Sequence, residues 1–130
     1  MRGIDTNVLL RYLVQDDPDQ ARRATRFLFE ECTVDEPGLV NRVVMCELVW
    51  VLQSGYGYSR DAVLQVLDRI MGTAQLTIED RQVTADAVNE YRNGADFADA
   101  LISKVNLRLG CEHTATFDRK AARRPGFLAL

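Results

Sequence analysis

The sequence predicts an α/β fold, a small sandwich in which helices cover both faces of a parallel sheet. Short apolar segments alternate with helix-like segments along all 130 residues, which is the order expected of repeated strand–helix–strand units. Apolar residues make up 47% of the chain and charged residues 27%, which is a globular composition. No repeat or low-complexity linker interrupts the alternation, so we expect residues 1–130 to form a single domain.

Charge and cysteine content exclude several classes of protein. The net charge of −3 argues against a general nucleic-acid-binding protein, which is usually basic overall. Cys32, Cys46 and Cys111 are odd in number and far apart, so neither a disulfide framework nor a zinc site is expected. The chain meets an acid at Asp5 without a preceding apolar run, and no segment approaches membrane-spanning length. We therefore expect a cytoplasmic protein that does not bind membranes.

The first part of the chain predicts two short strands and four helices. Pro18 suits the first turn of a helix, and Ser59 is a favoured N-cap. The segment around Trp50 is nearly apolar all round, which predicts a mostly buried helix. In chain order we expect a strand at 3–4, helices at 6–14 and 19–31, a strand at 38–40, and helices at 43–52 and 60–71.

The second part continues the alternation. Asn93-Gly94 is a stop signal, and Gly110 is a suitable C-terminal cap for the helix before it. We expect a strand at 76–78, helices at 79–91 and 97–109, a strand at 113–117, a short basic helical stretch after Asp118, and a strand at 127–130.

The helix after Gly94 carries two acids at its start. Asp96 and Asp99 are three residues apart, so both carboxylates can point off the N-terminal end of the helix. Taken alone, the pair is typical of helix capping, with Asp96 as the N-cap and Asp99 in the first turn, where the helix dipole favours negative charge.

Two further acids directly follow predicted strands. Asp5 ends the first strand and Asp118 follows the strand at 113–117. Ligands of open parallel sheets bind beyond the carboxyl ends of the strands, so Asp5 and Asp118 can share one rim of the sheet. Each acid alone is also explained as a helix N-cap.

Glu47 is the only charged residue between Arg42 and Arg60 and lies in the most apolar predicted helix. A buried carboxylate without a partner costs several kcal/mol or gives up its charge. Glu47 therefore needs a basic group, a metal ion or water in a cleft, and a structural ion pair is the simplest of these.

Several carboxylates in one cleft repel one another unless a cation lies among them. Mg²⁺ or Mn²⁺ fits, because hard divalent ions prefer oxygen ligands. Such an ion activates water and neutralises charge on a phosphate, so metal-assisted phosphodiester hydrolysis follows as a reaction class. The only histidine, His113, opens a strand and is expected to be structural.

At these residues the sequence resembles the PIN-domain ribonucleases, and most closely the VapC-type toxins of bacterial toxin–antitoxin pairs. The resemblance covers essentially the whole chain, in the expected order and spacing. The matching segments are Ile4-Asp5-Thr6-Asn7, Glu47-Leu48-Val49-Trp50-Val51-Leu52, Asp96-Phe97-Ala98-Asp99-Ala100-Leu101-Ile102 and Thr116-Phe117-Asp118-Arg119-Lys120.

The resemblance implies a metal-dependent endoribonuclease with a small parallel-sheet α/β/α sandwich fold. It also implies a homodimer whose site is blocked by the C-terminal segment of a cognate antitoxin. The implied catalytic residues, which would hold Mg²⁺ or Mn²⁺ around the attacking water, are Asp5, Glu47, Asp99 and Asp118, with Asp96 as an auxiliary ligand. Thr6, Asn7 and Thr116 would hydrogen-bond the carboxylates or the scissile phosphate.

Three features lie around these motifs. Many relatives have Ser or Thr where this chain has Asn41-Arg42, and the role of these two residues is left open. Arg119, Lys120, Arg123 and Arg124 follow Asp118 and are candidates for guiding RNA phosphates, without sequence preference. By analogy, the first two helices would form the antitoxin groove, with Arg11, Leu13, Phe27 and Phe29.

Other functions remain open at this point. A haloacid-dehalogenase-like phosphatase also has an Asp after its first strand, but it requires a second Asp at the position of Asn7. It also uses a catalytic lysine before a late acidic pair, whereas Lys104 follows Asp96 and Asp99. An inactive PIN-like interaction module is a non-enzymatic alternative. A PIN nuclease of RNA maturation without a toxin role is the third.

Overall fold

The computed structural model describes all residues, 1–130, and the chain divides into two compact units, Met1–Glu79 and Asp80–Leu130. The first unit is an α/β unit around a three-stranded parallel sheet in the order β1-β2-β3. The second unit contains two helices and a two-stranded parallel sheet.

The elements of the first unit follow the predicted order. They are β1 (Arg2–Gly3), α1 (Thr6–Val14), α2 (Pro18–Arg26), β2 (Gly38–Val40), α3 (Arg42–Trp50), α4 (Arg60–Met71) and β3 (Leu76–Ile78). Helices α2 and α3 each continue into a π-helical turn, at Phe27–Glu31 and Val51–Gly55.

Side-chain caps fix where these helices begin. The side chains of Asp17, Asn41 and Ser59 accept hydrogen bonds from backbone N–H groups in the first turns of α2, α3 and α4, at 2.9 to 3.1 Å. Each cap satisfies a donor that has no partner within its helix and contributes about 1 kcal/mol.

The core of the first unit consists of apolar side chains from the sheet and from the inward faces of its helices. A fully buried leucine or valine contributes roughly 1.5–3 kcal/mol. The most deeply buried of these side chains are Leu9, Val40, Met45, Leu48, Leu52, Val63 and Leu67.

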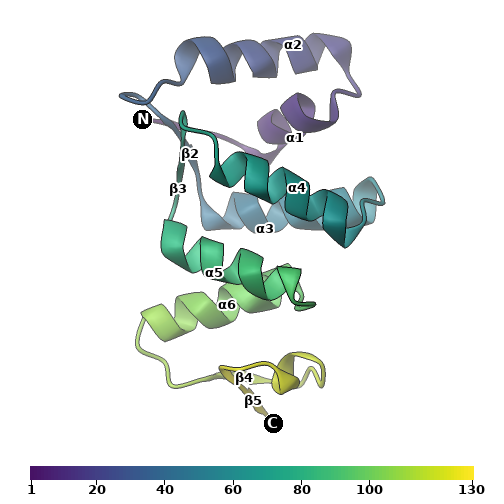
Figure 1. Ribbon diagram of the computed structural model, residues 1–130, viewed down its shortest axis with the longest axis vertical. Coiled ribbons are helices and arrows are strands. Elements are labelled where there is room, and N and C mark those ends of the chain that lie inside the picture. Colours follow the sequence, from purple (N-terminus) through teal and green to yellow (C-terminus); the bar gives the residue numbers. More distant parts are fainter. The chain divides into compact units, whose positions relative to one another are not determined.

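In the second unit, α5 (Arg81–Arg92) and α6 (Phe97–Arg108) lie side by side (Figure 1). Tyr91 and Phe97 pack edge to face across the connection between them, with ring centroids 6.0 Å apart. β4 (Thr114–Thr116) pairs with β5 (Phe127–Ala129), and a 3₁₀ turn at Ala121–Arg123 connects them. Gly110 follows α6 with a φ of +98°, the left-handed conformation typical of the residue after a helix.

Three predicted helices differ clearly from the structure at their ends. The helix expected at 19–31 is an α-helix only to Arg26, and the helix expected at 43–52 only to Trp50, because each continues into a π-helical turn. The helix expected at 79–91 begins at Arg81, because Asp80 has a left-handed φ of 47° that no right-handed helix accommodates.

The expectation that Asp5 and Asp118 follow strands of one sheet was wrong. β1 belongs to the three-stranded sheet, whereas β4 pairs only with β5. β1 is two residues long and presents few backbone groups for pairing, while β4 finds its hydrogen-bonding partner nearby in its own unit.

No helix in the structure is both long enough and apolar enough to cross a membrane.

Candidate active site

Asp5, Thr6 and Glu47 lie together in the first unit. Asp5 caps α1, and its Oδ1 accepts a hydrogen bond from the backbone N–H of Thr6 at 2.8 Å. The buried Thr6 hydroxyl donates to Oε1 of Glu47 at 2.5 Å, across 41 positions of sequence. Thr6 thereby connects the start of α1 with the middle of α3, and it bonds both acids.

Glu47 is exposed, so the prediction of a buried carboxylate in a mostly buried helix was wrong. The inward face of α3 is formed by Val44, Met45, Leu48 and Val49, which repeat with the helical period. Glu47 lies on the opposite stripe with two exposed apolar side chains, Val43 and Trp50. The helix is apolar on both faces, but only one of them is buried.

Asp96 and Asp99 are arranged at the start of α6 as the capping pattern predicts. Oδ2 of Asp96 accepts a hydrogen bond from the backbone N–H of Asp99 at 3.0 Å. The Asp99 side chain is half-buried in the first turn, while Asp96 is exposed. Asp96 is therefore an N-cap, whatever further role its charge has.

Asp118 is held by the backbone that follows it. Its Oδ1 accepts hydrogen bonds from the N–H groups of Lys120 at 2.8 Å and Ala121 at 3.0 Å. The backbone N–H of Asp118 donates to Oγ1 of Thr116 at 3.0 Å. Thr116 therefore orders the turn that presents Asp118, and Oδ2 of this acid takes part in none of these bonds.

The three acids of the second unit influence one another electrostatically. The pKa of Asp99 is raised above its ordinary value, first by burial and then by the negative charges of Asp96 and Asp118. Both effects disfavour the ionised form of the carboxyl group. A cation bound beside Asp99 would remove this penalty.

None of the five predicted acids forms an ion pair with a lysine or arginine, in contrast to several other acids of the chain. Asp16, Asp19, Glu30, Glu36, Glu79 and Glu90 all form ion pairs. The structural ion pair considered for Glu47 is not observed.

The donor chemistry of these five acids fits a hard divalent ion, since each offers carboxylate oxygen and none is neutralised by a basic side chain. In neither unit, however, do three histidine, cysteine, aspartate or glutamate side chains gather closely enough to form a metal site. The assignment of metal ligands stays a prediction.

The remaining predicted residues lie on the surface. Asn7 is exposed and lines a groove of about 470 Å³ between α1 and α2. Arg119 and Lys120 are exposed directly after Asp118. Arg124, predicted to guide phosphates, donates to the carbonyl of Asn93 at 3.1 Å and lies 4.0 Å from a Glu90 carboxylate oxygen.

The residues whose roles were left open also have partners. Asn41 caps α3, with Oδ1 accepting from the N–H of Val44 at 2.9 Å. Arg42 lies 3.7 Å from a carboxylate oxygen of Glu79. Lys104, which stands after the acidic pair and not before it as in a phosphatase of the haloacid dehalogenase type, lies 3.7 Å from a carboxylate oxygen of Glu90.

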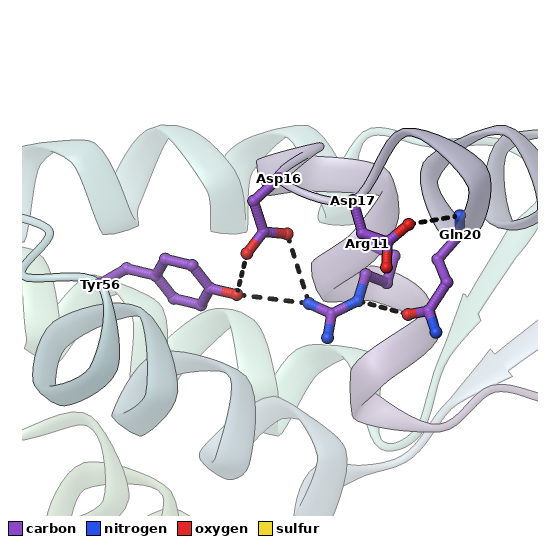
Figure 2. Close-up of polar contacts among 5 residues, drawn as sticks. All are labelled: Arg11, Asp16, Asp17, Gln20 and Tyr56. Carbon is purple, nitrogen blue, oxygen red and sulfur yellow. Dashed lines mark hydrogen bonds and ion pairs between the residues drawn. The ribbon is translucent and has the colours of Figure 1, made fainter.

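A polar network beside the groove was not anticipated from the sequence (Figure 2). Arg11 donates to Gln20 at 2.6 Å and to the hydroxyl of Tyr56 at 3.4 Å, and it pairs with Asp16 at 3.3 Å. The Tyr56 hydroxyl donates to Asp16 at 3.0 Å. Tyr56 is 45 positions from Arg11, and no local pattern predicts such a contact.

Comparisons with known proteins agree with the fold. The profile of the PIN domain family matches residues 4–127. The chain is also 26% identical over 121 residues to a protein named VapC ribonuclease from Aquifex aeolicus, covering 92% of this chain and 89% of the relative. No solved structure matches the chain significantly. Because the family profile spans nearly the whole sequence, this chain belongs to the PIN domain family.

Proposed function

We propose that this protein is a metal-dependent endoribonuclease that hydrolyses RNA phosphodiester bonds, and that it is the toxin of a toxin–antitoxin pair. Membership of the PIN domain family is the observation that carries the proposal. The similarity to a VapC ribonuclease supports both the RNA substrate and the toxin role. The unpaired acids support metal dependence, because carboxylates without basic partners suit a divalent cation.

In this proposal Asp5, Glu47, Asp99 and Asp118 are the catalytic residues and ligands of Mg²⁺ or Mn²⁺, with Asp96 as an auxiliary ligand. A divalent ion held by these residues would supply Lewis acidity, which would lower the pKa of water and offset negative charge on the phosphate. The protein itself orients the catalytic carboxylates. Thr6 orients Glu47 through its hydrogen bond to Oε1, and the backbone of Lys120 and Ala121 orients Asp118.

The pKa of Asp99 is raised above its ordinary value, first by burial and then by the negative charges of Asp96 and Asp118, so its carboxyl group holds a proton more readily than an ordinary aspartate does. We propose that it must lose this proton before it binds a cation. Cleavage then increases with pH through the titration of Asp99.

RNA reaches the acids through contacts of its phosphates with Arg119 and Lys120, and with Asn7 in the first unit. Both basic side chains are exposed. Phosphate contacts of this kind provide affinity but no base preference.

We further propose a homodimer that acts in the cytoplasm and binds an antitoxin along α2. Two grooves adjoin this helix. One, of about 470 Å³, includes Arg11 and Phe27, and the other, of about 730 Å³, includes Phe29. Phe29 is 54% exposed, which suits contact with an apolar side chain of a partner segment.

The test is cleavage of an end-labelled panel of single-stranded RNAs by purified protein with Mg²⁺, Mn²⁺ or EDTA. Asp99→Asn removes a proposed ligand. Asp61→Asn is the matched control, because Asp61 is the first-turn acid of α4 as Asp99 is of α6. We expect metal-dependent cleavage by wild type and Asp61→Asn only. Equal cleavage by Asp99→Asn, or no cleavage after any bound partner is stripped away, contradicts the proposal.

A PIN nuclease of RNA maturation without a toxin role is the second candidate, favoured by the same family match. It predicts the same cleavage without growth arrest on expression and without a small co-purifying protein.

A further inference from the structure

Phe117 has the greatest exposure of the large apolar side chains of this protein, at 85%. Its ring belongs to none of the aromatic pairs in the structure. Exposed apolar residues are common on proteins, so exposure alone does not define a site. The ordered turn and the charged residues beside Phe117 suggest a role for this ring.

The backbone on both sides of Phe117 is fixed. Asp118, the next residue, donates its N–H to Thr116 at 3.0 Å and accepts from Lys120 and Ala121 at 2.8 and 3.0 Å. Thr116 is also the last residue of β4. The ring is therefore presented to solvent from an ordered turn, so little backbone freedom would be lost when a ligand binds it.

Three basic residues follow Phe117 in the chain, and their positive charge suits a nucleic acid strand. Arg119, Lys120 and Arg123 follow within six positions and are all exposed. Proteins that bind single strands combine aromatic rings, on which bases stack, with basic side chains along the backbone. Asp118 adjoins the ring in the chain, with Cα atoms about 3.8 Å apart, so a base on Phe117 would bring its phosphates close to this acid.

We propose that Phe117 stacks on an unpaired base of the substrate and thereby positions the neighbouring phosphate at Asp118. The inference rests on the proposed ribonuclease function and narrows it to single-stranded or looped RNA. Bases within a duplex already stack on their neighbours, so they do not offer a face to the ring. Phe117 is a substrate-positioning residue with little base preference, because every base has a stacking face.

The experiment measures binding and stacking separately from cleavage. Asp99→Asn protein is titrated, in Mg²⁺, into single-stranded RNA that carries 2-aminopurine at successive positions, because stacking quenches the fluorescence of this base. Phe117→Leu keeps apolar volume without the aromatic face, and Phe117→Trp keeps the face. Leu109→Ala is the control, since Leu109 is 76% exposed at the other end of α6 from Asp99.

We expect quenching at one position next to the cleaved bond, retained in Phe117→Trp and in Leu109→Ala and lost in Phe117→Leu. The affinity for RNA should fall about tenfold in Phe117→Leu, which lies within the range found when one base–aromatic stack is lost. In the otherwise wild-type protein, Phe117→Leu should raise KM for single-stranded RNA more than it lowers kcat.

The outcomes separate this inference from the proposed function. If wild type cuts RNA with metal while Phe117→Leu binds, quenches and cuts as wild type does, stacking is wrong and the nuclease stands. If Phe117→Leu instead changes only the oligomeric state or the binding of a protein partner, the ring is a protein contact and stacking is again wrong. If wild type neither binds nor cuts RNA, both proposals fail.

Discussion

Thr6 is the residue that connects two acids far apart in sequence. Its buried hydroxyl donates to Glu47, and its backbone N–H donates to Asp5. Thr6→Val keeps the shape of the side chain and removes the hydroxyl. We expect a stability change of no more than about 1 kcal/mol, because Glu47 is exposed and water can replace the bond.

The effect of Thr6→Val on cleavage should be larger, a roughly tenfold or greater loss of kcat, since Glu47 loses its fixed orientation. Thr77→Val, at an exposed position of β3, is the control. Single-turnover RNA cleavage checks the prediction, and a Thr6→Val protein as fast as wild type would mean that orientation of Glu47 is unimportant.

The substitution Asp99→Asn should change stability and activity in opposite directions, raising the stability of the fold while abolishing cleavage. Its folded-state pKa is raised, so the folded state binds more protons than the unfolded chain and the ionised carboxyl destabilises the fold. This penalty is absent below the ordinary aspartate pKa of about 3.9, grows as pH rises through the raised value and is complete above it.

In EDTA, Asp99→Asn should therefore be more stable than wild type at neutral pH, by up to about 1 kcal/mol, which corresponds to a few degrees in Tm. The difference should shrink as pH falls towards 4. Thermal unfolding followed by circular dichroism measures it; a less stable Asn variant at neutral pH would show that Asp99 is not under repulsion.

Glu47 could be singled out from the sequence, but its exposure could not. Glu47 is unusual because it is the only acid among apolar residues, but the same pattern wrongly predicted that it is buried in the core. Val43 and Trp50 are apolar yet exposed, so the helical stripe could not be read from hydrophobicity alone. The contact with Thr6 depends on the packing of α1 against α3, which no local pattern encodes.

At the scale of elements, helix α6 begins at a residue with two separable functions. Asp96 caps the helix through Oδ2, and its charge acts on Asp99. Asp96→Asn keeps an N-cap acceptor and removes the charge, whereas Asp96→Ala removes both.

We expect Asp96→Ala to lose about 1 kcal/mol of stability and Asp96→Asn to lose little. If the charge is an auxiliary metal ligand, both variants cut RNA more slowly. Chemical denaturation and cleavage assays together separate the two functions, and full activity in Asp96→Asn would leave Asp96 as a cap only.

The network around Arg11 predicts how the connection between α1 and α2 is held. Figure 2 shows Arg11 between Asp16, Gln20 and Tyr56, with Asp17 capping α2 beside them. Arg11→Met should cost about 1 kcal/mol and raise amide hydrogen exchange in residues 15–20. Tyr56→Phe, which removes one hydroxyl, should have a smaller effect, and unchanged exchange in Arg11→Met would mean that the α1–α2 connection is ordered without the network.

Most elements were predictable because their signals are local. Ser59 marked the start of α4, and the apolar triplets of β2 and β3 were located at their observed bounds. The π-helical turns after α2 and α3 carry no comparable signal. Local pattern thus gives the existence of a helix more reliably than its ending.

For the whole molecule, alternation predicted an α/β fold with parallel strands, and the PIN family match agrees. The pairing of strands was not predictable, because it depends on contacts distant in sequence, and the chain forms a sheet in each unit. The order of the four motifs identified the family, but the site itself could not be built from spacing alone.

Binding of a divalent ion by Asp5, Glu47, Asp99 and Asp118 is the property on which the proposed function depends most. Calorimetric titration of Mn²⁺ into metal-free protein measures it without RNA. We predict binding by wild type and by Asp61→Asn, and at least tenfold weaker binding by Asp5→Asn and by Asp99→Asn. Wild-type affinity in both of the last two variants, or no Mn²⁺ binding by folded wild type, would contradict the proposed metal site.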